Sequence, residues 1–303
     1  MSCRRQFLAS VIAVVALCTP GPGSRAQAPA PAAAAQAAAK LPNRANSLKF
    51  AVLGDFGTGS RQQRELGAEM AKLLKTFPFE FVITVGDNIY GGERPQDMRR
   101  KFEEPYKALL DSGVKFYASL GNHDERAQSK YALFNMDGRT YYSFKAPKED
   151  VRFFALESDY LDPRQVGWIE KELASAGERW KIPYFHHPLY SSGNRHGSHL
   201  DLRAVLEPLF VANDVTVVFT GHDHFYERVK PQKEIVYFVV GSGGQLRRGN
   251  IDRNSGITAV GFDTDQVFLA AEIDGDELYF NAISRTGAVI DAGVIERRKP
   301  ARP

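Results

Sequence analysis

Six side chains that can bind metal ions lie at or directly after the ends of short apolar segments in this 303-residue chain. Oxygen and imidazole ligands of this kind together suit iron, zinc and manganese. Six ligands exceed what one ion needs, so the set predicts two ions that share a bridging carboxylate. The residues are Asp55, Asp87, Asn122, His186, His222 and His224.

The segment Gly221-His222-Asp223-His224 is the most specific of the motifs that contain these residues. Alternate residues on an extended segment point the same way, so its two histidines can serve two adjacent ions. A single Gly-Asp pair after a strand is more often a turn, and a lone histidine in a loop is usually at the surface. The prediction therefore depends on all the motifs together and on their order.

The segments that must position these ligands are apolar runs typical of strands covered on both faces. Helical patterns at 64–75, 163–176 and 200–210 alternate with them, and this alternation predicts an α/β fold. Ligands in such folds bind beyond the carboxyl ends of the strands, so the side chains converge if the strands are neighbours. The apolar runs are 50–53, 81–85, 116–120, 182–185 and 215–220.

After residue 233 the sequence changes to short strands and turns. We expect these strands to form a second sheet, stacked on the first within one domain. Gly241-Ser242-Gly243-Gly244 lacks the following Gly-Lys-Ser/Thr of a phosphate-binding loop, so a tight turn is predicted there. The strands are expected at 235–240, 258–262, 267–273, 278–283 and 289–295.

The N-terminal region has the pattern of an export signal over residues 1–28. Arg4 and Arg5 precede an apolar run at 8–17, and small residues suitable for cleavage follow; the alternative is an amphipathic N-terminal helix. The arginine pair resembles a twin-arginine signal, which predicts a periplasmic or secreted protein. The run is too short to span a bilayer, and no later segment has 18 consecutive apolar residues, so no stable membrane insertion is expected.

The remaining chain divides by composition into three parts. Residues 29–46, rich in alanine and proline, are predicted to be a flexible linker; 47–298 would form the catalytic domain and 299–303 a tail. Both cysteines lie within the signal, so we expect no disulfide in the mature chain.

The charge balance disfavours a nucleic acid partner. The formal charge is +3, and the signal carries three arginines and no acidic residue, so the mature charge is +3 − 3, near zero. A local basic patch at Arg247-Arg248 and Arg253 remains an alternative.

The motifs resemble the metal-binding blocks of the calcineurin-like metallophosphoesterases, in the order of that family and over residues 54–224. Tyr90 marks the purple acid phosphatase branch, and the compact size resembles its small, tartrate-resistant type. The resemblance and the strand pattern predict an α/β, four-layer α-β-β-α sandwich of two packed mixed sheets. The blocks are Gly54-Asp55-Phe56-Gly57, Gly86-Asp87-Asn88-Ile89-Tyr90, Gly121-Asn122-His123-Asp124, His186-His187-Pro188 and Gly221-His222-Asp223-His224.

The resemblance implies a division of the ligands between two ions. Asp55, Tyr90 and His224 would hold Fe(III), and Asp87 would bridge. The second ion, divalent iron, zinc or manganese, would be held by Asn122, His186 and His222. His187 sits one place late for the family's ligand.

The ligand charges agree with this division. A phenol with a pKa of about 10 loses its proton at neutral or acid pH only beside a strong Lewis acid, so Tyr90 calls for a trivalent ion.

The implied activity is that of an acid phosphatase that hydrolyses phosphate monoesters with a metal-bound hydroxide. His123 would protonate the leaving group, Asp124 would orient its imidazole, and His196 would face the substrate; His199 is a weaker candidate. One alternative is a phosphodiesterase or nucleotidase with two divalent ions, and another is a non-catalytic scaffold. The expected partners are small phosphate esters, and the oligomeric state is open.

The segment at 154–163 runs almost directly into the next predicted helix. The animal enzymes of the family carry there a longer loop that represses activity until it is cut. We therefore expect activity without proteolytic activation.

Overall fold

The computed structural model describes residues 41–299. The predicted signal at 1–28, the linker up to residue 40 and all but the first residue of the predicted tail at 299–303 lie outside the described residues. Residues 41–46 differ from the flexible linker that we expected. Leu41 is buried in the core, and the backbone N–H groups of Asn43 and Arg44 donate to the Glu272 carboxylate at 2.6 and 2.7 Å. These contacts fix residues 41–46 to the domain.

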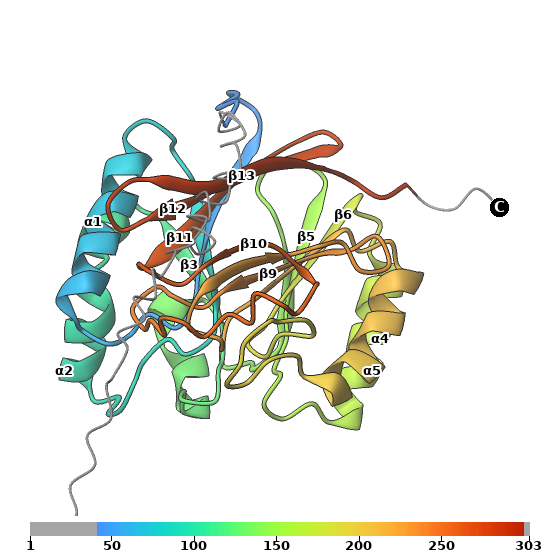
Figure 1. Cartoon of the computed structure of the whole chain (residues 1–303), viewed down its shortest axis with the longest axis horizontal. Coiled ribbons are helices and arrows are strands. Elements are labelled where there is room, and N and C mark those ends of the chain that lie inside the picture. The colour runs from blue at the N-terminus through green and yellow to red at the C-terminus, as the bar shows by residue number, and fades with distance from the viewer. Residues whose placement is uncertain (1–40, 300–303) are drawn as a thin grey trace, which may run out of the picture. The chain divides into compact units, whose positions relative to one another are not determined.

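Two mixed sheets form the centre of the described domain (Figure 1). In the six-stranded sheet, whose order is β13-β12-β11-β1-β2-β3, the last three strands are parallel. In the seven-stranded sheet, whose order is β10-β8-β9-β7-β6-β5-β4, the parallel strands are β5, β6, β7 and β9.

The strands of the first sheet are β1 (Leu48–Leu53), β2 (Phe81–Val85), β3 (Lys115–Ser119), β11 (Val267–Asp274), β12 (Glu277–Ser284) and β13 (Val289–Glu296). Those of the second are β4 (Tyr142–Lys145), β5 (Val151–Ala155), β6 (Trp180–Tyr184), β7 (Val217–Thr220), β8 (Tyr226–Val229), β9 (Val236–Val240) and β10 (Thr258–Phe262).

Helices cover the outer faces of both sheets, so the predicted four-layer sandwich is confirmed (Figure 1). The first sheet is covered by α1 (Arg61–Leu74), whose Leu66 and Met70 are fully buried. The second is covered by α4 (Pro163–Ser175) and α5 (Leu200–Ala212). Shorter helices are α2 (Pro95–Met98), a π-helical turn (Arg99–Glu103), α3 (Lys107–Asp111) and 3₁₀ turns at Arg126–Lys130 and Ala132–Phe134.

Local capping explains where the long helices begin. The Ser60 hydroxyl accepts a hydrogen bond from the Gln63 N–H at 3.2 Å, so α1 starts three residues before the predicted helix at 64. The Asp162 carboxylate accepts from the Gln165 N–H at 2.8 Å, and Pro163 occupies the first helical position of α4.

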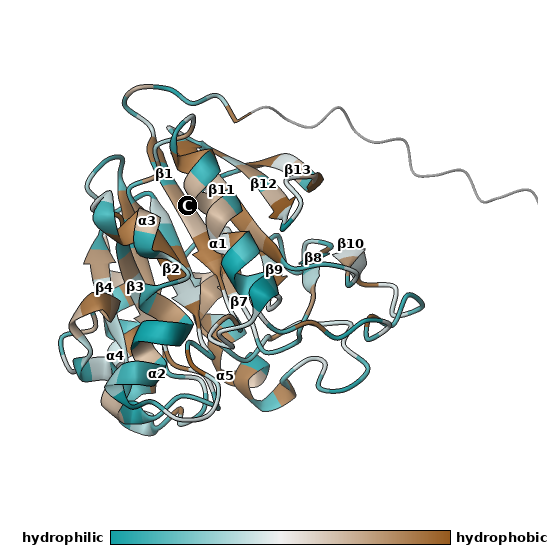
Figure 2. Cartoon of the chain, turned by 90° about the vertical axis from the view of Figure 1, so that its left-hand side faces the viewer, coloured by the Kyte–Doolittle hydropathy of each residue, from teal (hydrophilic) through white to brown (hydrophobic). Residues whose placement is uncertain are grey.

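Aromatic side chains join the two sheets. The Phe50 ring from β1 lies 5.2 Å from Phe153 of β5 and 6.2 Å from Phe219 of β7, both in edge-to-face geometry. The strands are predominantly hydrophobic, as Figure 2 shows, because both faces of each sheet are covered.

The sheet assignment of the last strands corrects our expectation. We expected the strands after residue 233 to make the second sheet, but β11, β12 and β13 extend the first sheet. The physical reason is that β11 pairs antiparallel with β1, from Leu48 opposite Ile273 to Val52 opposite Leu269. This pairing places β1 inside the sheet, where every residue of the strand is buried.

The ligand-bearing strands are therefore not neighbours in one sheet. Three of them, β1, β2 and β3, belong to the first sheet, and β6 and β7 belong to the second. None of the helices within residues 41–299 is long and apolar enough to cross a membrane.

Candidate metal centre

The loops after five parallel strands bring together all seven residues that the sequence predicts as metal ligands. Asp55, Asp87 and Asn122 follow β1, β2 and β3, while His186 and His222 follow β6 and β7. The site lies at the carboxyl ends of strands in both sheets, as the fold class predicts.

The first ligand group surrounds the Tyr90 hydroxyl. This oxygen lies 2.8 Å from Asp87 Oδ2, 3.1 Å from Asp55 Oδ1 and 3.3 Å from His224 Nε2. The donor atoms of Asp55, Asp87 and His224 all lie within 4.8 Å of one another, which is close enough to hold one ion.

The second ligand group surrounds His186 Nε2. This nitrogen lies 3.1 Å from Asn122 Oδ1, 3.2 Å from His222 Nδ1 and 3.4 Å from Asp87 Oδ1. The other ring nitrogen of His186 is 2.9 Å from the Val85 carbonyl oxygen, which fixes the direction of the ring. Asp87 thus presents one carboxylate oxygen to each group.

His187 lies beside the second group, although sequence reasoning set it aside. Its donor atom lies within 4.8 Å of those of His186 and His222, and its Nδ1 is 3.0 Å from the Ser158 hydroxyl. The adjacent pair His186-His187 was the only feature of the sequence that pointed to His187. Adjacency along the chain does not show that both rings face the second ligand group.

The donor set fits a pair of borderline metal ions. It combines two carboxylates, a phenol and an amide with three or four imidazoles, the ligand types that suit iron, zinc and manganese.

Burial keeps the imidazoles in the neutral form that binds metal. It lowers the pKa of His187 and the pKa of His224 to about 4, and the pKa of His186 and the pKa of His222 also fall well below the usual 6.5. Burial, together with Asp55 and Asp87, raises the pKa of the Tyr90 phenol above its usual 10. Removing that proton therefore requires a strong Lewis acid.

The close approach of the loops requires backbone conformations that residues other than glycine rarely adopt. Asp55, Asp87 and His222 all have positive φ, at 54°, 50° and 70°. A Cβ on Gly121 would lie 2.3 Å from Asp87 Oδ1, and a Cβ on Gly221 would lie 2.5 Å from Asp55 Oδ2. These glycines leave the space that a ligand from another loop fills.

The structure corrects the expected role of Asp124. We expected its carboxylate to orient the His123 imidazole, but the carboxylate joins the loops after β2 and β3. Desolvation, followed by the charge of Asp87, raises the pKa of Asp124 to about 7. Its oxygens accept hydrogen bonds of 2.7 to 3.0 Å from Asn88 N and Nδ2, Ile89 N, Gly121 N and Gln128 Nε2.

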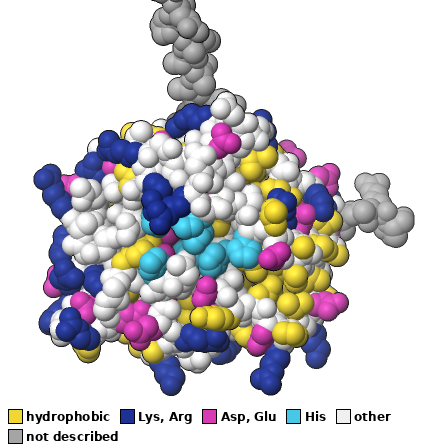
Figure 3. Space-filling model, turned by 60° about the horizontal axis from the view of Figure 1, so that its bottom comes forward, with side chains coloured by type: hydrophobic (Ala, Val, Ile, Leu, Met, Phe, Trp, Pro, Cys, Tyr) yellow, Lys and Arg dark blue, Asp and Glu magenta, His cyan; other side chains and the backbone are white. Residues whose placement is uncertain are grey.

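Two exposed histidines flank the ligand groups. The His123 ring centre is 4.8 Å from the Tyr90 ring, and its backbone N–H donates to Asp87 Oδ1 at 3.0 Å. The His196 ring centre is 4.3 Å from the His222 ring. Figure 3 shows histidines gathered on one face of the protein, with basic side chains beside them.

His199 has a structural role. It caps the N-terminus of α5, because its Nδ1 accepts from the Leu202 N–H at 3.4 Å.

The glycine-rich segment at 241–244 supports the first ligand loop through backbone hydrogen bonds. The Gly243 N–H donates to the Gly54 carbonyl at 2.9 Å, and the Gly244 N–H donates to the Asp55 carbonyl at 3.0 Å. The segment is a turn after β9, as the missing Gly-Lys-Ser/Thr predicts.

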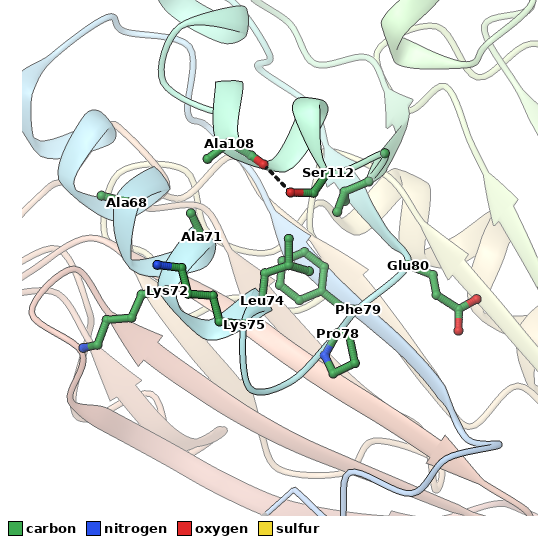
Figure 4. A pocket seen from close by; sticks show the side chains of 12 residues that line it. Ala68, Ala71, Lys72, Leu74, Lys75, Pro78, Phe79, Glu80, Ala108 and Ser112 are labelled. Atoms are coloured by element: carbon green, nitrogen blue, oxygen red, sulfur yellow. Dashed lines mark hydrogen bonds between the residues drawn. The ribbon is translucent and has the colours of Figure 1, made fainter.

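A concave surface lies away from the ligand loops. It is a groove of about 840 Å³ between α1 and α3, lined by Leu74, Phe79 and Val114 among others (Figure 4). Residues 78–80 and 112–114 of its lining directly precede β2 and β3, so the groove lies at the amino ends of these strands. No candidate metal ligand lines it.

Two packed mixed sheets with metal-ligand groups at their strand ends define the metallophosphoesterase class of fold. The family model described as calcineurin-like phosphoesterase matches residues 48–226, and this chain belongs to that family. The family and the ligand groups together indicate a metal-dependent phosphoesterase with a dinuclear centre.

Relatives confirm the resemblance to purple acid phosphatases. Purple acid phosphatase 17 of Arabidopsis thaliana is 28% identical over 68% of this chain and 71% of the relative. Tartrate-resistant acid phosphatase type 5 of Homo sapiens is 25% identical over 88% of this chain and 97% of the relative.

Solved structures share the fold. A purple acid phosphatase from yellow lupin, Lupinus luteus, superimposes with a TM-score of 0.66 at 18% identity, over 85% of this chain and 55% of that one. GAP50, the anchor in the inner membrane complex of Plasmodium, gives 0.72 at 20% identity, over 84% of this chain and 90% of that one.

Proposed function

We propose that this protein is an exported acid phosphatase that hydrolyses phosphate monoesters with an Fe(III)–M(II) centre. The observation that carries the proposal is the position of the Tyr90 hydroxyl, within 3.3 Å of two carboxylates and an imidazole. A phenol in this group adds a ligand that favours a trivalent ion, because phenolate forms only beside a strong Lewis acid.

In this proposal the ligand groups divide between two ions. Asp55, Tyr90 and His224 would hold Fe(III), and Asp87 would be shared with the divalent ion. Asn122, His186 and His222 would hold the divalent ion: iron, zinc or manganese. When bound, the pair of ions supplies Lewis acidity and an activated water.

The chain's own residues place and protonate the substrate. His123, exposed beside Tyr90, donates a proton from its imidazole to the leaving-group oxygen. His196, exposed above His222, donates a hydrogen bond to a phosphate oxygen. Asp124 holds two ligand loops together and does not contact the substrate.

The test is metal analysis with an absorption spectrum on protein exported by its own route. We expect about one iron and one divalent ion per chain, with a visible phenolate-to-iron band, and hydrolysis of an aryl phosphate at acid pH. A colourless, fully loaded and active protein would show instead the related phosphodiesterase or nucleotidase with two divalent ions. A metal-loaded protein that hydrolyses neither phosphate monoesters nor phosphate diesters would be the non-catalytic scaffold.

The variant Tyr90→Phe tests the observation directly. It removes the phenol but leaves the ring, so the visible band should disappear while the fold is retained by circular dichroism. The control is Tyr160→Phe, because Tyr160 is 61% exposed and lies outside both ligand groups. A band that persists in Tyr90→Phe refutes the assignment of Tyr90 as a ligand.

N-terminal sequencing of the exported protein tests export itself. We expect residues 1–28 to be absent. Retention of the arginine pair in mature protein would contradict the predicted signal.

A further inference from the structure

Asp223 lies between the ligand histidines 222 and 224 in the sequence, yet its carboxylate bonds to a different part of the protein. Its side chain is fully buried and belongs to neither ligand group. Asp223 Oδ2 accepts hydrogen bonds from the Ser191 hydroxyl at 2.5 Å and from the Gly197 N–H at 3.1 Å. Asn250 Nδ2 lies 3.5 Å from the other oxygen.

The bonded loop, residues 191–197, carries His196. Ser191 and Gly197 are the two ends of this loop, so one carboxylate oxygen closes it. Its middle also lies against Asp223, because a Cβ on Gly193 would be 2.3 Å from Asp223 Oδ2. The position of the Asp223 carboxylate therefore determines the position of the loop.

A bend in the backbone explains the arrangement and corrects the extended segment that we expected at 221–224. His222 has a φ of 70°, and the N–H groups of Asp223 and Phe225 donate to the carbonyls of Gly221 and Asp223 at 2.8 and 2.7 Å. His222 joins the second ligand group and His224 the first, while the Asp223 carboxylate bonds to the 191–197 loop. One short segment thus faces the two ligand groups with its histidines and the His196 loop with its carboxylate. The distance of 4.3 Å between the His196 and His222 rings is the result.

We propose that Asp223 is a positioning residue. Its hydrogen bonds hold the His196 loop against residues 222–224 and so determine the position of the His196 imidazole relative to the ligand groups. This inference rests on the proposed function, in which His196 contacts the phosphate. Asp223 itself touches neither substrate nor ion. Because a shift of about 1 Å in such a group can lower a rate by about 100-fold, the position of the loop matters for turnover.

The test is a double-mutant cycle with Asp223→Asn, His196→Ala and the double variant. Asparagine keeps the size of the side chain, but its amide has one acceptor oxygen and turns N–H groups towards donors. We expect Asp223→Asn to lower kcat for an aryl phosphate by about 10- to 100-fold with both ions retained by elemental analysis. In the His196→Ala background the same change should have little further effect.

The matched control is Asp291→Asn. Asp291 is also a buried aspartate, and its carboxylate accepts from the Tyr226 hydroxyl and the Arg228 guanidinium, both at 2.8 Å. It has no bond to the His196 loop, so its effect on kcat should be the same with and without His196. Additive effects for Asp223→Asn, or loss of the ions, would overturn the proposal.

Hydrogen exchange provides a readout that needs no activity. The Gly197 amide should exchange at least ten-fold faster in Asp223→Asn, and in Ser191→Ala to a smaller extent, while Asp291→Asn leaves it unchanged. An unchanged Gly197 amide in Asp223→Asn overturns the inference. Absence of monoester hydrolysis in the unmodified protein would refute the proposed function but leave the exchange result decisive for the loop.

Discussion

At the scale of the single residue, Asp87 joins the two ligand groups of the candidate centre. Its Oδ2 lies 2.8 Å from the Tyr90 hydroxyl and its Oδ1 lies 3.4 Å from His186 Nε2. Oδ1 also accepts the His123 N–H at 3.0 Å, so the same carboxylate locates an exposed histidine. Loss of this one side chain should disturb both groups.

The variant Asp87→Ala should therefore lose both ions. A carboxylate shared by two ions cannot be replaced by a ligand of either group alone. Elemental analysis after gel filtration measures the result. Retention of a full pair of ions would argue against a bridging role, and Asp263→Ala, which removes a buried carboxylate outside the centre, controls for general loss of structure.

The variant His123→Ala should slow alkyl phosphates more than activated aryl phosphates. A poor leaving group needs a proton in the transition state, and general acid catalysis contributes about 10² to 10⁴ in rate. We expect a decrease in kcat of about 100-fold for an alkyl ester and about ten-fold or less for a nitrophenyl ester. Equal slowing of both esters would remove the proposed acid role.

At the scale of elements, the centre depends on how closely five loops from two sheets approach. Each loop supplies ligands to a shared space, and the spacing between loops is set by glycines and by the Asp124 hydrogen bonds. Positive φ at Asp55, Asp87 and His222 shows that the loops are held in a conformation that residues other than glycine rarely adopt.

The variant Gly121→Ala tests this close approach. Its Cβ would lie 2.3 Å from Asp87 Oδ1, so we expect loss of metal and a decrease in stability of about 1 to 3 kcal/mol. Gly167→Ala is the matched control, because no atom lies within 4 Å of its Cβ in α4. That change should leave metal binding intact and raise stability by about 0.5 to 1 kcal/mol. Thermal unfolding with metal analysis measures both, and full metal retention in Gly121→Ala would contradict the geometry.

At the scale of the whole molecule, burial between two sheets sets the protonation of the centre. In the unfolded chain histidines bind protons near pH 6.5, but in the folded protein His187 and His224 do so near pH 4. Between these values the unfolded state binds more protons, so these two groups lower the stability of metal-free protein as the pH falls from 6.5 to 4.

Nuclear magnetic resonance of metal-free protein should show this shift directly. The ring signals of His187 and His224 should titrate near pH 4, with assignments from His187→Gln and His224→Gln. Protons then compete with metal for these rings only as the pH approaches 4. Midpoints near 6.5 would show that the rings are solvated.

The intact chain should be active without cleavage. Only residues 156–162 connect β5 to α4, and Ser158 within this connection contacts His187. We expect limited proteolysis to leave kcat unchanged or to lower it. A several-fold rise in activity after cleavage would show that a segment of the chain covers the centre.

The sequence by itself determined the residue types of the candidate ligands, the strands that precede them and the class of fold. Apolar runs, helical periodicity and the order of the motifs are local properties, so Phe81–Val85 and Val217–Thr220 could be identified as strands from their own residues. The assignment of individual ligands to the two ions remains a prediction.

Only the tertiary structure decided which strands are neighbours and what each carboxylate contacts. Pairing between β1 and β11 joins residues more than 200 positions apart, and no local pattern encodes it. The same holds for Asp124, which joins two ligand loops, and for Asp223, which holds the His196 loop. Such contacts arise from the packing of two sheets against each other, because packing brings together side chains that are distant along the chain.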